Sequence, residues 1–163
     1  MKKILLFILT CIFSAGLYAQ NIQKPQNIQK PQDVSNIGFI NELADKDAVT
    51  YADGVRFFLI VMGKIPKSFQ ENINTLAGEG ITTGIDLKED SRLKRGAFSL
   101  MIARYLKLKD SLMYSIFKTE RYAYRACVAN GIMNYDGSEW ENLNGGEVIE
   151  IMTKVSEMTG GNE

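Results

Sequence analysis

The side chains that could carry out chemistry in this 163-residue chain are carboxylates, because the sequence contains no histidine. Without an imidazole the chain cannot form a Ser-His-Asp triad or a Cys-His pair, and it lacks the commonest ligand of transition metals. Glycan hydrolysis needs only two carboxyl groups in different environments. The sequence offers four for that role, namely Glu79, Asp86, Glu139 and Glu141. None lies in an apolar stretch that would raise its pKa, so we predict that the chain is not an enzyme.

Oxygen-bearing side chains also crowd one loop, which therefore has the composition of a weak calcium site. They are Asn134, Asp136, Ser138 and Glu139. The twelve-residue calcium-binding pattern does not fit, because Glu139 stands where that pattern needs glycine and Gly145 stands where it needs glutamate. We therefore predict no metal site and no cofactor.

Only one cysteine, Cys127, follows the N-terminal apolar segment. A single thiol can form neither a thiolate zinc site nor an internal disulfide. Because Ala126 and Val128 flank it, we expect Cys127 to be a small buried side chain. An intermolecular disulfide and a reactive thiol are the alternatives.

A repeated apolar pattern predicts the elements that must position these side chains. Counted from Thr50, Lys94 and Asn144, the residues seven, eight and eleven places later are apolar each time. The three sets are Phe57, Phe58 and Val61; Met101, Ile102 and Tyr105; and Ile151, Met152 and Val155. This spacing places each set on one face of a helix. The period of 44 to 50 residues is typical of an array of supersecondary units.

The N-terminal region has the composition of a leader followed by a linker. Residues 1–19 combine two lysines, a short apolar run and Ala19 at the end, so we predict a secretory signal peptide cleaved after Ala19. A lipoprotein modified at Cys11 is the alternative. Residues 20–34 contain the sequence NIQKPQ twice and predict a tether, with a docking peptide as the alternative. The folded domain is expected at 35–159, with a tail at 160–163.

Within the folded domain, helices are expected at 50–63, 68–78, 94–106, 111–117, 119–130 and 144–158. Three of them begin with a residue pair suited to a reciprocal capping box. These pairs are Thr50 with Asp53, Ser68 with Glu71, and Asn144 with Glu147. An alternating β pattern is nearly absent, so we predict an all-α array of three helix–loop–helix repeats whose first repeat is truncated.

Two segments, residues 80–98 and 131–148, carry the same features in the same order. Each begins with Gly-Ile, continues through a polar loop and reaches a second helix at Lys94 or Asn144. Both segments resemble the S-layer homology repeat, which has a Gly-Ile helix end, a loop with an aromatic or apolar plug, and a helix opening on I-T-R-G-E or T-R-A-E. The resemblance implies a three-pronged helical bundle that attaches noncovalently to cell-wall polysaccharide or peptidoglycan in the bacterial envelope.

The resemblance also implies which residues bind, because the family uses the Arg and Glu of the helix-opening motif. Arg95 stands at the family's Arg and Glu147 at its Glu, with Asp53 as a shorter acid, and no unit has both. Helix capping is the other interpretation of Glu147 and Asp53. Arg95 places a cation at a helix start, which is unfavourable for the helix dipole and favours a paired or functional role. Trp140 stands at the plug position, where it either packs between helices or forms a stacking platform for a sugar ring.

Removing the two leader lysines from the 19 basic residues leaves 17, against 19 acidic residues. This balance gives no bulk attraction to nucleic acid. In residues 107–125, where basic and aromatic residues mingle, we expect a solvated helical face with its core stripe.

These features together lead to three hypotheses on function. The first is a non-catalytic exported binding module or adaptor, periplasmic or at the cell surface, which docks on an envelope protein or cell-wall glycan. It would have no transmembrane segment after cleavage of the leader. The second is a structural or assembly subunit of an envelope complex, which uses apolar surface at residues 57–61. The third is a carboxylate-dependent cell-wall glycan hydrolase.

Overall fold

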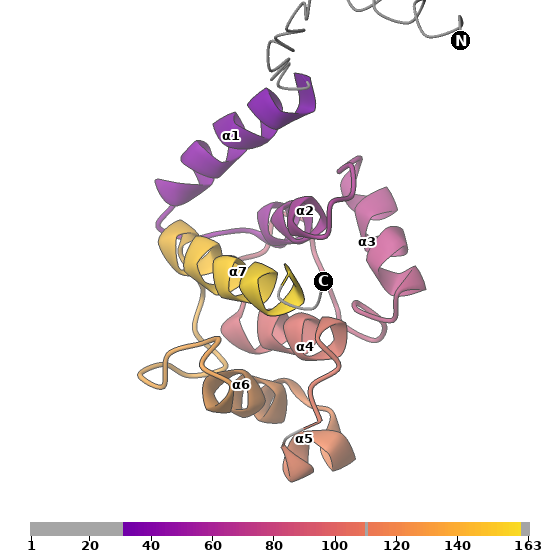
Figure 1. Cartoon of the computed structure of the whole chain (residues 1–163), viewed down its shortest axis with the longest axis vertical. Helices are drawn as coiled ribbons and strands as arrows, with labels where there is room; N and C mark the ends of the chain where they lie inside the picture. The colour runs from indigo at the N-terminus through magenta and orange to yellow at the C-terminus, as the bar shows by residue number, and fades with distance from the viewer. Residues whose placement is uncertain (1–30, 110, 161–163) are drawn as a thin grey trace, which may run out of the picture.

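The computed structural model describes residues 31–109 and 111–160 (Figure 1). These two ranges contain seven helices and no strand, which confirms the predicted all-α fold class. The helices are α1 (Pro31–Ala44), α2 (Tyr51–Val61), α3 (Phe69–Gly78), α4 (Arg95–Tyr105), α5 (Leu112–Phe117), α6 (Glu120–Ala129) and α7 (Gly145–Gly160). Within the described ranges, no helix is both long and apolar enough to cross a membrane. The predicted leader and most of the predicted tether lie outside the described residues.

The helix α1 was not predicted from the sequence. It begins at Pro31, so the last four residues of the segment predicted as a tether are helical. The chain after them packs onto the core through Phe39 and Leu43, which are both buried. A helix therefore precedes α2, although we predicted that the first repeat is truncated.

Local capping fixes the starts of α2 and α7 as predicted. The Thr50 hydroxyl accepts from the Asp53 amide, and the Asp53 carboxylate accepts from the Thr50 amide, which completes a capping box. Asn144 and Glu147 exchange the same pair of bonds at the start of α7. The predicted box at α3 is wrong, because the Ser68 hydroxyl donates to the Glu71 carboxylate at 2.6 Å and caps no backbone amide.

The three sets of matched apolar residues contribute to one core. Phe58, Ile102 and Met152 are fully buried, and Phe58 meets the rings of Phe98 and Tyr105 edge-on at centroid distances of 6.1 and 5.4 Å. Phe57, Phe58 and Leu59 are buried and Ile60 and Val61 are partly buried, so little of the apolar surface that we predicted at residues 57–61 for an assembly subunit is accessible.

A closed ring of three backbone hydrogen bonds lies at the centre of this core. The Leu93 amide donates to the Val49 carbonyl at 2.7 Å, the Leu143 amide to the Leu93 carbonyl at 3.0 Å, and the Val49 amide to the Leu143 carbonyl at 2.9 Å. All three residues are fully buried, and each lies one residue before the cap position of α2, α4 or α7. The ring thus ties three distant chain segments to one point, directly before the starts of α2, α4 and α7.

The same cyclic order governs the first amides of these helices, which have no partner within their own helix. The Tyr51 amide of α2 donates to the Ser91 carbonyl at 2.9 Å, and the Arg95 amide of α4 to the Glu141 carbonyl at 2.9 Å. The Gly145 amide of α7 closes the cycle by donating to the Lys46 carbonyl at 2.8 Å. Each helix start is therefore held by the loop that precedes another of the three helices.

Candidate functional site

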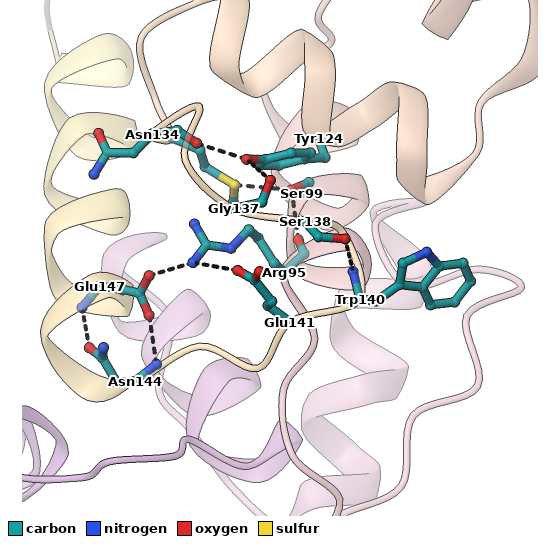
Figure 2. Close-up of polar contacts among 11 residues, drawn as sticks. Arg95, Ser99, Tyr124, Asn134, Gly137, Ser138, Trp140, Glu141, Asn144 and Glu147 are labelled. Atoms are coloured by element: carbon teal, nitrogen blue, oxygen red, sulfur yellow. Dashed lines mark hydrogen bonds and ion pairs between the residues drawn. The ribbon is translucent and has the colours of Figure 1, made fainter.

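Arg95, the first residue of α4, reaches the first turn of α7 with its side chain. Its Nη2 atom is 2.5 Å from Oε1 of Glu147 and 3.7 Å from Oε2 of Glu141, and its side chain is 8% exposed (Figure 2). The motif Arg of one segment and the motif Glu of another, 52 positions apart, therefore form an ion pair. Arg95 thus has the paired role that its place at a helix start favours.

The loop before α7 covers the Arg95 side chain. Nε of Arg95 is buried without a hydrogen-bond partner among the described residues. A Cβ atom at Gly137 would lie 2.8 Å from Cζ of Arg95, so a larger residue at this position would have to displace the guanidinium. The guanidinium is therefore enclosed by protein, and its nearest carboxylates balance its charge.

Glu147 uses both of its carboxylate oxygens within the chain. Oε2 accepts from the Asn144 amide at 3.0 Å, while Oε1 accepts from Arg95 (Figure 2). The capping interpretation of Glu147 is confirmed, and the ion pair with Arg95 is an additional contact that the sequence did not predict. Each oxygen of this carboxylate therefore already has a partner within the chain, and the side chain is 29% exposed.

Asp53 also caps its helix, at a place separate from the Arg95 pair. Its Oδ1 accepts from the Lys46 ammonium at 2.7 Å, and its Oδ2 accepts from the Thr50 amide and hydroxyl. Burial alone would raise the pKa of Asp53, but hydrogen bonds from Lys46 and Thr50 outweigh burial and hold the pKa below its usual value. The structure thus groups Arg95 with Glu147 and leaves Asp53 outside that group.

Trp140 projects from the outer side of the same loop, and its ring points away from the Arg95–Glu147 pair (Figure 2). Its side chain is 69% exposed, so the prediction that it packs between helices is wrong. The Lys94 ammonium lies 5.6 Å from the centre of the indole ring, within the range of a cation–π interaction. The remaining interpretation, a stacking platform, is compatible with this exposure.

The loop that carries Trp140 is fixed by hydrogen bonds along its length. The Tyr124 hydroxyl lies 2.8 Å from the Asn134 carbonyl and 2.9 Å from the Gly137 carbonyl. The Trp140 amide donates to the Ser138 hydroxyl at 3.3 Å (Figure 2). The carbonyls on either side of Trp140 accept from the first two amides of α4 at 2.9 Å each. An exposed indole is therefore mounted on a loop whose backbone has little freedom.

Several of these contacts could not be found from the sequence. Glu141 beside Arg95, Lys94 beside Trp140 and Tyr124 under the loop are brought together by the packing of α4, α6 and the loop. One signal did exist, since the motif positions of the resemblance include Lys94 and Arg95. The partners of both residues belong to another unit, Glu147 for Arg95 and Trp140 for Lys94, which the motif of a single unit does not indicate.

Glu79, one of the four carboxylates that could serve glycan hydrolysis, forms an ion pair with Lys64 at 2.6 Å. A hydrogen bond from Lys64 lowers the pKa of Glu79, opposite to what a catalytic acid requires. Within the described ranges no group of three or more potential ligands could hold a metal ion. Cys127 is fully buried as predicted, and desolvation raises the pKa of its thiol to about 12, which disfavours the reactive alternative.

No family model matches the chain, and no curated protein matches it.

Proposed function

We propose that this chain is a non-catalytic binding module of the bacterial cell envelope that docks on cell-wall glycan through Trp140. The observation that supports this proposal is the exposed indole of Trp140, on a loop whose backbone is held by hydrogen bonds at the residues before and after it. Trp140 is the only tryptophan of the chain, and it contributes little to the core. An aromatic ring kept in water in this way loses the burial energy that the core would give it.

Stacking on a sugar ring would recover that energy. The flat apolar face of a pyranose covers an indole as another apolar group would, and a fixed loop loses little conformational entropy on binding. Lys94 lies beside the ring and would add attraction toward an acidic polymer. The proposed ligand is therefore a glycan that carries carboxylate or phosphate groups.

The proposed site differs from the one that the resemblance to S-layer homology repeats implies. Arg95 and Glu147 form an ion pair with each other, and opening this pair for a ligand would leave the buried guanidinium without its nearest counter-charge. We assign them the task of joining α4 to α7. Binding would then depend on Trp140 and Lys94, on the outer side of the loop.

The proposal has two further parts, which concern export and the origin of the fold. Export follows from the predicted leader at residues 1–19, which would bring the module to the periplasm or the cell surface. The origin of the fold in three drifted copies of one helix–loop–helix unit is supported by the closed ring of hydrogen bonds and by the cyclic order of the helix starts.

The proposal is tested by sedimentation of the protein with isolated sacculi that have been treated with protease but retain their wall polymers. We expect the protein in the pellet, at least tenfold less for Trp140→Ala, and an unchanged amount for Ile65→Ala, an equally exposed apolar residue elsewhere. Sedimentation equal for Trp140→Ala and the unsubstituted protein would contradict the proposal. Loss of sedimentation on protease treatment would identify an envelope protein as the partner instead.

A further inference from the structure

Helix α5 exposes almost all of its apolar side chains. Of its six residues only Tyr114 is buried. Leu112 is 73% exposed and Phe117 55% exposed, and Met113 and Ile116 are exposed as well. The helix lies at the end of the molecule opposite α1 (Figure 1). The solvated polar face that we expected in this region is therefore wrong for residues 112–117, where the exposed face is apolar.

The exposed side chains are held in place, which argues against a loose chain segment. The buried side chain of Tyr114 anchors α5 in the core. The Ser111 hydroxyl accepts from the Tyr114 amide and caps the start of the helix. The ring of Phe117 stacks on Tyr122 of α6 with a centroid distance of 5.3 Å. Exposure of a contiguous apolar set on an anchored helix marks a contact surface.

Lysines flank this apolar set on both sides. Lys107 and Lys109 precede α5, Lys118 follows it, and all three are exposed. None of the three forms a salt bridge within the described residues, although the charge of Lys107 helps to lower the pKa of Glu79. Over residues 107–125 there are five basic residues (the three lysines, Arg121, Arg125) and two acidic ones (Asp110, Glu120), so the net charge is 5 − 2 = +3.

Two of these lysines occupy backbone positions that do not suit a lysine. Lys107 has φ 52° and Lys118 has φ 49°, in the left-handed region that favours glycine and asparagine. A helix end at such a position is normally closed by one of those residues. The backbone conformation at residues 107 and 118 therefore does not explain why both residues are lysine.

We propose that α5 inserts its apolar side chains into the surface of an anionic lipid bilayer, with Lys107, Lys109 and Lys118 bound to the lipid headgroups. An apolar tip surrounded by cations matches the boundary between acyl chains and anionic headgroups. A second copy of the chain fits the same surface poorly, because a symmetric contact through α5 would bring the two sets of lysines together. The proposal does not depend on the glycan site, since Trp140 has no part in it.

The test uses a single tryptophan as a local reporter of insertion. In Trp140→Phe/Phe117→Trp the only indole lies on α5, and in Trp140→Phe/Ile65→Trp it lies between α2 and α3 at a site of comparable exposure, 65%. Both proteins are mixed with phosphatidylglycerol vesicles whose acyl chains are brominated, because bromine quenches an inserted indole. Fluorescence of the predicted leader does not interfere, since that segment contains no tryptophan.

We expect strong quenching of the α5 reporter, weak quenching of the Ile65 reporter, and a loss of quenching when phosphatidylcholine replaces phosphatidylglycerol. Lys107→Asn/Lys118→Asn, which suits the left-handed backbone, should weaken vesicle binding roughly 25-fold, from about fivefold per lysine. Circular dichroism would verify that each variant keeps its helices. Equal quenching of the two reporters, or dimers that disappear in Leu112→Ser/Ile116→Ser without any lipid quenching, would overturn the proposal.

Discussion

At the scale of single residues, the buried ion pair of Arg95 is the contact with the largest consequence. Its guanidinium is almost wholly removed from water, and one oxygen of Glu147 supplies the nearest negative charge. Glu141 is farther away and about half exposed, so solvent screens its contribution. The two carboxylates therefore contribute differently to the stability of the fold, and substituting each one measures its contribution.

Glu147→Gln should lower the free energy of unfolding by about 2 kcal/mol, because it leaves the buried Arg95 without its close counter-charge and weakens the cap of α7. Glu141→Gln is the matched control and should cost less than about 0.5 kcal/mol. Urea unfolding followed by circular dichroism measures both values. Equal losses for the two variants would show that the 2.5 Å contact has no special weight.

Asp53 gives a prediction on pH. Its folded-state pKa lies below the ordinary value of 3.8, so the carboxylate stabilises the fold above that value, and the contribution is lost as pH falls through the folded-state pKa. Asp53→Asn should therefore destabilise the protein at pH 7 and make little difference near pH 2. Guanidinium unfolding of both proteins at several pH values measures the gap. A gap that stays constant from neutral to acid pH would contradict the assignment.

At the scale of elements, the packing of α7 against the end of α1 depends on a single glycine. A Cβ atom at Gly145 would lie 1.6 Å from the Leu43 carbonyl oxygen, which is backbone and cannot turn aside. At the next position, Gly146, the nearest atom to such a Cβ is the Asn144 side-chain oxygen at 3.4 Å. Of two adjacent glycines in the first turn of α7, Gly145 therefore has no room for a side chain, whereas Gly146 has room for a methyl group.

Gly145→Ala should destabilise the protein by about 3 kcal/mol or more, because α7 must move away from α1. Gly146→Ala should be neutral or stabilise by about 0.5 kcal/mol, since alanine favours the helix. Thermal unfolding of the two variants provides the comparison. Similar midpoints for both would show that α1 and α7 do not meet at this point.

The elements also show what the sequence could and could not predict. The starts of α2 and α7 were predicted because their capping boxes use residues three positions apart. The prediction of a box at Ser68 was wrong, because the Ser68 hydroxyl donates to the Glu71 side chain and accepts from no backbone amide of the helix. The partner of Arg95 and the exposure of Trp140 depend on contacts between distant segments, for which local spacing contains no information.

At the scale of the whole molecule, the ring formed by Val49, Leu93 and Leu143 joins three parts of the chain into one body. None of its bonds can open without disturbing the other two, since all three residues are fully buried. The amides of these residues should therefore exchange with solvent only through global unfolding, and all three should give one free energy of opening. Hydrogen exchange measured by nuclear magnetic resonance, corrected for the intrinsic exchange rate of each amide, tests this expectation, and a lower free energy of opening at one amide would show that one segment opens by itself.

The two proposals together assign this body two distinct contact surfaces, namely Trp140 with Lys94 on the loop before α7, and the apolar face of α5. The first concerns wall glycan and the second a lipid surface. Variants at one surface should leave binding at the other unchanged. This separation lets the two proposals fail or succeed independently.

The most direct measurement of the central claim is the fluorescence of Trp140 during titration with soluble, purified wall glycan, because the chain has no other tryptophan. We predict a saturable change in intensity and wavelength as the indole leaves water, and weaker binding of acidic glycan by Lys94→Gln. A spectrum that stays constant at glycan concentrations sufficient to compete the protein off sacculi would contradict the claim, since the wall would then be bound elsewhere.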